Sequence, residues 1–238
     1  MTTLFISDLH LTEDEPRVAD AFISFVDEYA RQAEALYILG DFFEVWLGDD
    51  DNTAFNRGII DALAALPIDK YIMHGNRDFL IGETFCKTAG LTLIPDPSVL
   101  DIYGTKVLCM HGDSLCTRDE QYMATRRMVR NPAFQQELLS QPLEVRASIA
   151  KGARDKSKAH TRETALEIMD VTPDEVIREL VSHGTTLLVH GHTHRPAIHE
   201  HALINNTSGT RIVLGDWNRQ AWYLRWDDNG YDLRSYDI

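Results

Sequence analysis

The sequence predicts an α/β fold in which two stacked sheets carry helices on their outer faces and a helical segment interrupts the chain. Short apolar runs alternate with amphipathic helical patterns, which is typical of strand–helix–strand units. Such units have right-handed crossovers, so the inner strands are expected to be largely parallel. At 238 residues, the chain has room for one full domain and a sizeable insertion or appendage.

Six apolar runs are expected to be buried strands because each leads into a polar side chain, in most cases through a turn residue. These runs cover residues 4–7, 35–39, 70–74, 107–110, 186–189 and 212–214. Helices fill the first connections. Pro16 can open a helix in which Phe22 and Val26 recur at helical spacing, and Phe55, Ile59 and Leu63 repeat the pattern.

Two hairpins are expected to add antiparallel strands to the parallel core. Gly104–Thr105 separates residues 99–103 from residues 106–110, and residues 228–230 separate 222–226 from 231–235. The sheets are therefore expected to be mixed at their edges.

Residues 115–183 break the alternation and are predicted to be helical over 119–130, 133–140 and 143–169. A capping box at 172–175 is expected to open a last helix that ends at Gly184. The helical part, 115–167, is predicted to be a lid-like cap on a core formed by 1–114 and 168–238.

The cap also concentrates positive charge. Residues 118–162 hold ten basic and five acidic side chains, a net charge of +5, whereas the rest of the chain carries −19. A basic patch on an acidic protein suits an anionic substrate or surface, although a solvated helix face explains it equally well. Net negative charge elsewhere disfavours duplex DNA as a partner.

Composition excludes several classes of protein. The chain is 44% apolar and 25% charged, which is typical of a globular protein and not of a disordered chain. No apolar run approaches the length of a membrane span, and the N-terminal segment does not resemble a signal peptide. Cys86, Cys109 and Cys116 are odd in number and lack metal-type spacing, so a reduced, cytoplasmic protein is expected.

Metal-type ligands follow five of the predicted strands, and this is the strongest functional signal. Open α/β sheets bind ligands beyond the carboxyl ends of their strands, so these side chains are expected to meet. Each motif alone is weak, but five together are not expected by chance. They are Asp8-x-His10, Gly40–Asp41, Gly75–Asn76, His111 and Gly191–His192–Thr193–His194.

The types of ligand narrow the chemistry. Two carboxylates, one amide and four imidazoles exceed what one tetrahedral ion needs and suit two ions that share a bridging ligand. Without a thiolate, the set favours Mn, Fe(II), Zn or Co. Two such ions can activate a water and clamp a phosphoryl oxygen, so the expected reaction is hydrolysis of a phosphoester or phosphoanhydride.

In order and spacing these motifs resemble the calcineurin-like metallophosphoesterases. The resemblance implies a four-layer α/β/β/α sandwich. It also implies that Asp8, His10, Asp41 and His194 hold one metal, that Asp41 bridges, and that Asn76, His111 and His192 hold the other.

The resemblance extends to one subfamily of the lipid A pathway. LYILGDFFEVWLGDDD, MHGNRDFLIG, MHGDSLCTRDEQY, IMDVTP and HGHTHRPAIH carry it across almost the whole chain. It implies Mn²⁺-dependent hydrolysis of UDP-2,3-diacylglucosamine to UMP and 2,3-diacylglucosamine 1-phosphate, with two Mn²⁺ per chain. It further implies an acyl-binding cap and a peripheral position on the cytoplasmic side of the inner membrane. No obligate protein partner and no nucleic acid are expected.

Arg77 follows the ligand Asn76, where many relatives carry His, and is the predicted catalytic residue. Its guanidinium can grip a phosphoryl group with two hydrogen bonds, while a salt bridge to Asp78 is the alternative. The resemblance implies that the substrate also contacts Asn76 and His192, and a further set of cap residues, Asp119, Ser157, Thr161 and Thr164. At Thr164 relatives often carry Lys, and Arg162 could replace that contact.

Two alternatives remain open from sequence. One is another enzyme of the same superfamily, such as a DNA exonuclease, a nucleotide pyrophosphatase or a phosphoprotein phosphatase. The other is a metal-binding scaffold without activity, which would be expected to have lost a ligand, whereas all seven are present.

Overall fold

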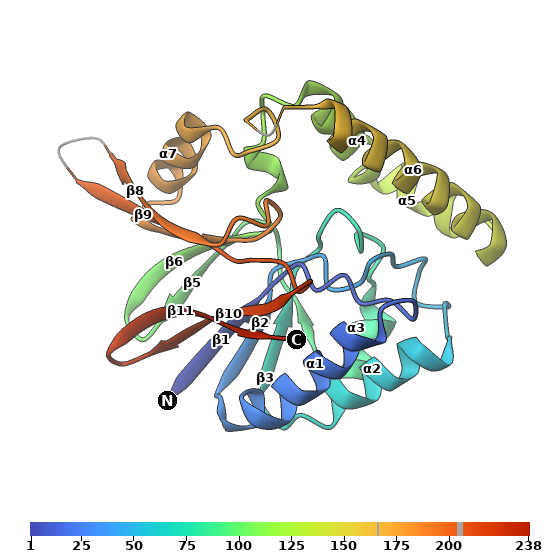
Figure 1. Cartoon of the computed structure of the whole chain (residues 1–238), viewed down its shortest axis with the longest axis horizontal. Coiled ribbons are helices and arrows are strands. Elements are labelled where there is room, and N and C mark those ends of the chain that lie inside the picture. The colour runs from blue at the N-terminus through green and yellow to red at the C-terminus, as the bar shows by residue number, and fades with distance from the viewer. Residues whose placement is uncertain (166, 204–206) are drawn as a thin grey trace.

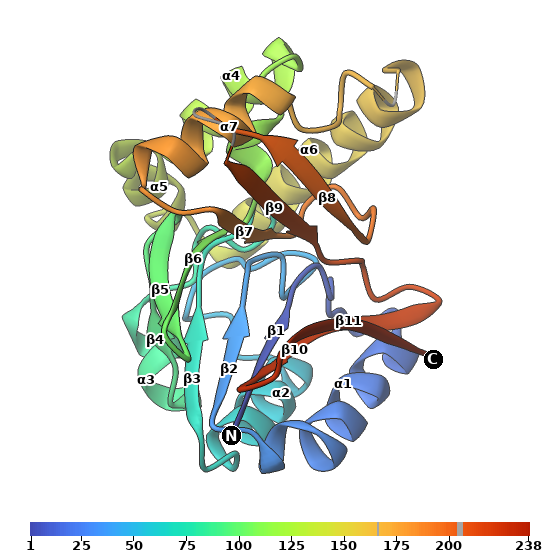
Figure 2. The ribbon, with the colours of Figure 1, turned by 90° about the vertical axis from the view of Figure 1, so that its left-hand side faces the viewer.

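Two sheets stack face to face in the computed structural model of the chain, which describes residues 1–165, 167–203 and 207–238, without the side chains of Thr161 and Glu163 (Figure 2). The first sheet has the strand order β11-β10-β1-β2-β3-β4. Strands β1 (Thr2–Ile6), β2 (Ala35–Ile38), β3 (Asp69–Ile72) and β4 (Thr92–Leu93) are parallel. The hairpin β10 (Gln220–Asp227) and β11 (Gly230–Asp237) extends the sheet in the antiparallel sense.

The second sheet has the order β5-β6-β7-β9-β8. Its inner strands, β6 (Thr105–Met110), β7 (Leu187–His190) and β9 (Ser208–Val213), are parallel. Antiparallel strands β5 (Ser98–Ile102) and β8 (Ala197–Ala202) form the edges. The expected parallel core with antiparallel additions is therefore confirmed in both sheets.

Helices cover the outer faces and give four layers. Helices α1 (Pro16–Glu28), α2 (Ala54–Ala64) and α3 (Glu83–Ala89), with the short η1 (Ala30–Gln32), lie against the first sheet (Figure 1). Helix α7 (Pro173–Ser182) covers the second sheet, next to the short η2 (Asp113–Leu115). Phe5, Tyr37 and Met73 meet Val107 and Ile212 in a buried cluster between the sheets. This is the α/β/β/α sandwich that the resemblance implied.

Both predicted hairpins form. Tyr103 and Gly104 connect β5 and β6 with positive φ angles of 50° and 82°, which the turns favoured in two-residue hairpins require. The capping box predicted at 172–175 is wrong in its side-chain bond. Thr172 is the N-cap of α7, but its hydroxyl accepts a hydrogen bond from Thr117 instead of capping the helix.

Three helices between η2 and α7 project beyond the sandwich: α4 (Glu120–Val129), α5 (Pro132–Leu139) and α6 (Leu143–Glu163) (Figure 1). The prediction that the third runs to residue 169 is wrong. Thr164 turns to extended backbone and ends α6, and His160, one turn earlier, contacts the Asp119 carboxylate at 2.7 Å. This contact joins the end of α6 to the N-cap of α4. None of the described helices is long and apolar enough to cross a membrane.

The projecting helices are attached to the core at two places. Near the sheets, the buried Asp113 forms an ion pair with Arg126, whose Nε lies 2.9 Å from its carboxylate, and Arg130 lies 3.7 Å from the same carboxylate. Further out, Arg146 is 4% exposed and binds both carboxylate oxygens of Asp50 and the carbonyl of Leu47. The helices are thus held over the loops that follow β2.

We expect Arg146→Met to loosen the outer attachment without unfolding the protein. Asp50 is 59% exposed, so solvent screening limits the loss of stability to about 1 kcal/mol. Amide exchange in α5 and the first half of α6 should accelerate roughly fivefold, the equivalent of that loss. The exposed Lys151 on the same helix provides the control, Lys151→Met; equal exchange in the two variants would contradict the attachment.

Candidate active site

All seven predicted ligands lie just beyond the carboxyl ends of parallel strands. Asp8 and His10 follow β1, Asp41 follows β2, and Asn76 follows β3. The remaining three, His111, His192 and His194, follow β6 and β7 of the second sheet. Because parallel strands end at one edge, the loops of both sheets meet there and bring the seven side chains together.

Glycine precedes several of these ligands because the loops touch one another. A Cβ atom at Gly75 would collide with the backbone nitrogen and the carboxylate of Asp41. One at Gly191 would collide with the carboxylate of Asp8 and with Ser7. The Gly–Asn and Gly–His pairs of the sequence therefore have a steric reason, since only glycine lets loops from different strands pack this closely.

Five of the seven residues have left-handed backbone conformations. The φ angles are 55° at Asp8, 52° at His10, 50° at Asp41, 66° at His192 and 55° at His194. Side-chain-bearing residues rarely adopt these angles, each at a cost of about 1 kcal/mol or more, and such strain clusters at functional sites. Hydrogen bonds between the loops, such as His10 N–H to the Asp41 carbonyl at 3.0 Å, hold the strained turns.

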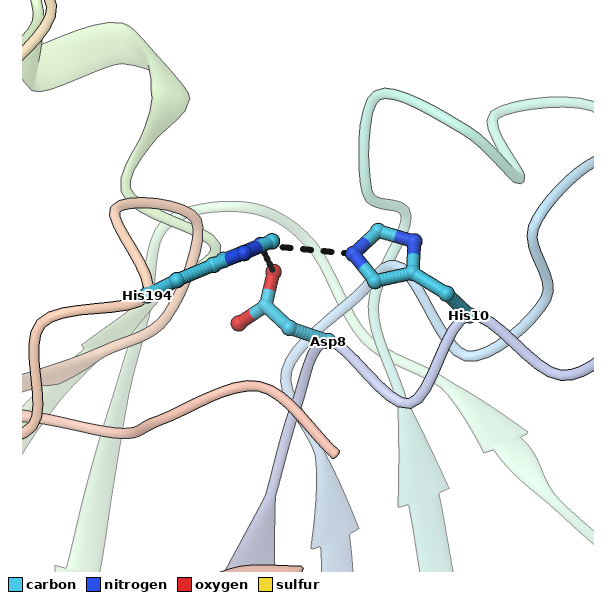
Figure 3. Close-up of side chains that lie close together, drawn as sticks. All are labelled: Asp8, His10 and His194. Atoms are coloured by element: carbon cyan, nitrogen blue, oxygen red, sulfur yellow. Dashed lines mark hydrogen bonds and ion pairs between the residues drawn. The ribbon is translucent and has the colours of Figure 1, made fainter. Parts of the chain in front are cut away.

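Asp8, His10 and His194 form one group that could hold a metal ion (Figure 3). The Nε2 atoms of the two histidines lie 3.3 Å apart, and His194 Nε2 lies 3.4 Å from Asp8 Oδ1. Ser7 Oγ and the His192 N–H donate to the other oxygen of Asp8, while the buried Oδ1 has no hydrogen-bond donor. An orphaned carboxylate oxygen facing two imidazole nitrogens is a donor set that fits a divalent cation.

Asp41, His111 and His192 form the second group, and Asn76 lies against its two histidines. His111 Nδ1 lies 2.9 Å from the Leu39 carbonyl, which can only accept, so Nδ1 donates and Nε2 is the nitrogen directed at the other ligands. Asn76 Oδ1 lies 3.0 Å from His111 Nε2 and 2.9 Å from His192 Nδ1. Two imidazole nitrogens converging on an amide oxygen again fit a cation.

Asp41 lies between the two groups. Its Oδ2 is 3.9 Å from His10 Nε2, and its Oδ1 is 3.7 Å from His111 Nε2. The carboxylate is 2% exposed, and the Arg77 backbone N–H donates to Oδ1 at 2.8 Å. One oxygen facing each group is the geometry that a bridging ligand requires.

The electrostatics also favour positive charge at this edge. Burial by itself lowers the pKa of His111, but the carboxylates of Asp41 and Asp113 outweigh it and raise the pKa to about 9. Burial raises the pKa of Asp8, yet the close approach and the charge of His194 bring it well below its usual range. The Asp8 carboxylate therefore stays ionised and attracts a cation.

Arg77 lines a cavity beside Asp8, His10 and His194. The alternative salt bridge is not among the ion pairs of the described residues, because both Asp78 oxygens accept backbone N–H groups, from Phe42 and Gly75, at 2.7 Å. Arg77 Nε is buried without a hydrogen-bond partner. The guanidinium is therefore available to an anion beside the two groups.

The remaining predicted substrate contacts belong to the projecting helices, in or at the ends of α4 and α6. Asp119 is 5% exposed and accepts from the Tyr122 N–H and from His160, whose ring also contacts the Thr164 hydroxyl at 3.3 Å. Asp119, His160 and Thr164 thus form a cluster at the base of the projecting helices. Ser157 lies on α6, and the side chain of Thr161 is outside the described part of the chain.

Several partners of the ligands were missed by sequence reasoning. Glu44 Oε2 lies 3.3 Å from His10 Nδ1, and Asp216 Oδ2 lies 3.7 Å from His194 Nδ1. Tyr122 packs its ring 5.3 Å from that of His192 and donates to Asp113. Partners of this kind orient metal-binding imidazoles. Only Asp216 had a signal, since it follows a predicted strand through Gly215.

A four-layer sandwich that gathers seven metal-type side chains where its strands end is the arrangement of a metal-dependent phosphoesterase. The family of calcineurin-like phosphoesterases matches residues 1–196. A UDP-2,3-diacylglucosamine hydrolase of Pseudomonas paraeruginosa is 56% identical over 235 residues, covering 97% of each chain. One of Azotobacter vinelandii is 53% identical over the full length of both. The chain therefore belongs to the calcineurin-like phosphoesterase family and, within it, to the group of these hydrolases.

Solved structures agree on the fold. A novel archaeal phosphodiesterase superposes with a TM-score of 0.52 at 15% identity, covering all of both chains. Vps29 of Chaetomium thermophilum gives a TM-score of 0.50 at 12% identity, covering 100% of this chain and 97% of that one. At these identities the likeness concerns the architecture alone.

Proposed function

We propose that the chain hydrolyses the diphosphate bond of UDP-2,3-diacylglucosamine to UMP and 2,3-diacylglucosamine 1-phosphate. The observation that carries this proposal is the identity above 50% to hydrolases of that name along the whole chain. The position of Asp41 between two groups of ligand-type side chains supports the same reaction. Water adds to one phosphorus, the bond from that phosphorus to the bridging oxygen breaks, and two phosphate monoesters leave.

Two divalent ions are proposed to bind at the strand ends. Asp8, His10, Asp41 and His194 would hold one, and Asp41, Asn76, His111 and His192 the other. When bound, such ions supply a nucleophilic water at neutral pH and polarise the phosphoryl oxygens. The mixture of imidazole, carboxylate and amide without thiolate favours Mn²⁺-type ions, and we propose two Mn²⁺ per chain.

Arg77 is proposed to bind a phosphoryl oxygen of the diphosphate and to stabilise the charge that develops there. The departing group is a phosphate whose second pKa is about 6, so it leaves without a strong general acid. A fixed guanidinium that forms two parallel hydrogen bonds meets the remaining requirement. The unpartnered, buried Nε of Arg77 supports this role.

Arg77→Lys keeps the charge but loses the planar fork. We expect kcat/KM to fall, with a loss of about 1.5–3 kcal/mol in transition-state stabilisation, the range for a hydrogen bond to a charged group. Metal content, measured by elemental analysis, should stay at the wild-type value. A Lys variant with full kcat/KM would assign Arg77 to structure.

Residues 115–167 are proposed to act as a cap on the core formed by 1–114 and 168–238. Exposed apolar residues of α4–α6, such as Met128, Val145 and Ile149, suit acyl chains. The net positive charge of this segment suits an anionic membrane surface. We accordingly propose a peripheral position on the cytoplasmic side of the inner membrane, with Asn76, Asp119, Ser157, Thr161, Thr164 and His192 in contact with the substrate.

The missing Lys at position 164 has a testable consequence. If Arg162, which is exposed on α6, supplies that contact, Thr164→Lys should change KM little and Arg162→Ala should raise it. Steady-state kinetics on both variants decide the matter. A tenfold lower KM for Thr164→Lys, about 1.4 kcal/mol, would mean that nothing replaces the contact.

The proposed function is tested by comparing substrates. The purified protein should turn over UDP-2,3-diacylglucosamine far faster than bis-p-nitrophenyl phosphate, and a chelator should abolish turnover until Mn²⁺ is restored. Preference for the simple diester, or for a nucleotide without acyl chains, would identify another phosphodiesterase or pyrophosphatase of the superfamily. The absence of turnover with every substrate would indicate a scaffold.

A further inference from the structure

A cavity of about 330 Å³ with both polar and apolar walls opens beside Asp8, His10 and His194. Beyond the ligand loops, its walls come from three further segments. The loop before α1 contributes Thr12 and Glu15, the segment after β9 contributes Asp216 and Asn218, and α6 contributes Arg154. Its volume is within the range of small-molecule sites. Because it includes ligand-type residues and Arg77, whatever extends from the diphosphate on this side must enter it.

The outer wall of this cavity is hydrophilic and partly immobilised. Arg17 donates to the Asn218 carbonyl at 2.8 Å and to the Ile238 carbonyl at 3.3 Å, so its guanidinium fixes the segment that carries Asn218. The side chains of Glu15 and Asn218 are exposed at the cavity rim. A rim of carboxylate, amide and hydroxyl groups offers hydrogen bonds, and Leu9, Val18 and Trp217 add apolar contact deeper in the cavity walls.

Glu15 lies at the N-terminus of α1 but does not stabilise the helix by capping it. It is the N-cap of α1, yet its side chain makes no capping hydrogen bond. Ser, Thr, Asp and Asn stabilise a helix at this position far better than Glu does. The Glu15 carboxylate is thus not engaged in capping and is available to accept hydrogen bonds from a molecule in the cavity.

The proposed substrate has an apolar acyl end and a polar nucleoside end, and the surroundings of the site likewise have an apolar side and a side with a polar rim. Acyl chains gain about 0.8 kcal/mol for each buried CH₂, which the charged groups at the cavity rim cannot provide over the length of a chain. Exposed apolar side chains stand instead on α4–α6 and on Val45. A nucleoside carries ribose hydroxyls and the amide-like edge of uracil, which match the rim of the cavity.

We propose that this cavity binds the uridine half of the substrate, with Glu15 accepting from the ribose hydroxyls and Asn218 pairing with the uracil edge. The proposal rests on the proposed function, since it requires a nucleoside diphosphate at the ligand cluster. It makes Glu15 and Asn218 specificity-determining residues that contact neither the ions nor the acyl chains.

A second cavity of about 470 Å³, lined by His74, Asp96, Arg126 and Arg130, is the competing location. None of the seven ligand residues lines it. Its guanidinium groups are already engaged, Arg126 with Asp113 and Arg130 with the His74 carbonyl at 3.1 Å. The cavity beside Asp8 is therefore the better site for a group attached to the diphosphate.

Product inhibition separates the two halves of the substrate. In the Mn²⁺-loaded protein, the Ki of UMP and the Ki of 2,3-diacylglucosamine 1-phosphate are measured for the wild type, Glu15→Gln, Asn218→Ala and the double variant. Calorimetric titration of UMP gives a second readout. We expect the double variant to weaken UMP at least tenfold and the lipid product less than twofold. Glu15→Gln should also lose the preference for UMP over 2′-deoxy-UMP.

Two controls complete the test. Glu13→Gln removes a neighbouring exposed carboxylate that does not line the cavity, and it should leave both Ki values unchanged. An unchanged Ki for UMP in the double variant, an equal rise of both Ki values, or a UMP-specific rise caused by Arg130→Gln instead would overturn the proposal. Failure of the wild type to hydrolyse UDP-2,3-diacylglucosamine would overturn the proposed function itself.

Discussion

Asp41→Asn is expected to reduce turnover by roughly a hundredfold or more, because it removes the one side chain that lies between both ligand groups. The amide has nearly the shape of the carboxylate but only one acceptor oxygen. The Arg77 N–H holds that oxygen on the His111 side, where it donates to Oδ1 in the wild type. The NH₂ group would then face His10.

This orientation predicts which ion is lost. An NH₂ group cannot bind a cation, so the group of Asp8, His10 and His194 should lose affinity more than the group around Asn76. Elemental analysis and Mn²⁺ titration measure both. Asp61→Asn, at an exposed position on α2, is the control and should behave as wild type. Two tightly held ions and more than a few per cent of wild-type turnover in Asp41→Asn would mean that Asp41 does not bridge.

Arg126→Met is expected to destabilise the protein by about 2–3 kcal/mol, since it breaks a buried ion pair and leaves one charge behind. Asp113 is 0% exposed and would keep the more distant Arg130, at 3.7 Å, and the hydrogen bond from the Tyr122 hydroxyl. For a chain of this length that loss lowers Tm by roughly 4–12 °C. Thermal unfolding measures it directly.

Arg127→Met is the matched control, because Arg127 is the exposed neighbour on the same helix, and it should change Tm little. Adding Asp113→Asn to Arg126→Met should restore part of the loss, as the uncompensated charge is then gone. Equal Tm values for Arg126→Met and Arg127→Met would contradict the buried pair. For the same reason, deleting residues 115–167 would leave the buried Asp113 without Arg126 and Arg130 and would destabilise the core.

The strands and ligands could be predicted from sequence because they depend on local patterns. An apolar run predicts a buried strand, and the Gly–Asp or Gly–Asn that follows it predicts a closely packed loop. The contact of Gly75 with Asp41 is an example. The carboxyl ends of parallel strands then bring the ligands together without further information.

Other features depend on partners far away in the chain. Glu44 and Asp216 become relevant only because folding places them beside His10 and His194. Strand β8 has the sequence AIHEHA, whose inward residues are small or polar, so no apolar alternation reveals it. The end of α6 depends on the contact between His160 and Asp119, 41 residues apart.

Mass spectrometry of the products formed from UDP-2,3-diacylglucosamine in H₂¹⁸O tests the central claim most directly. With Mn²⁺, the account predicts UMP and 2,3-diacylglucosamine 1-phosphate in equal amounts, with one ¹⁸O in one of the two phosphates. It predicts neither product after chelation, and at most about 1% of the wild-type amount with Asp41→Asn. Products that form equally well without a divalent ion, or cleavage at any bond other than the diphosphate, would contradict it.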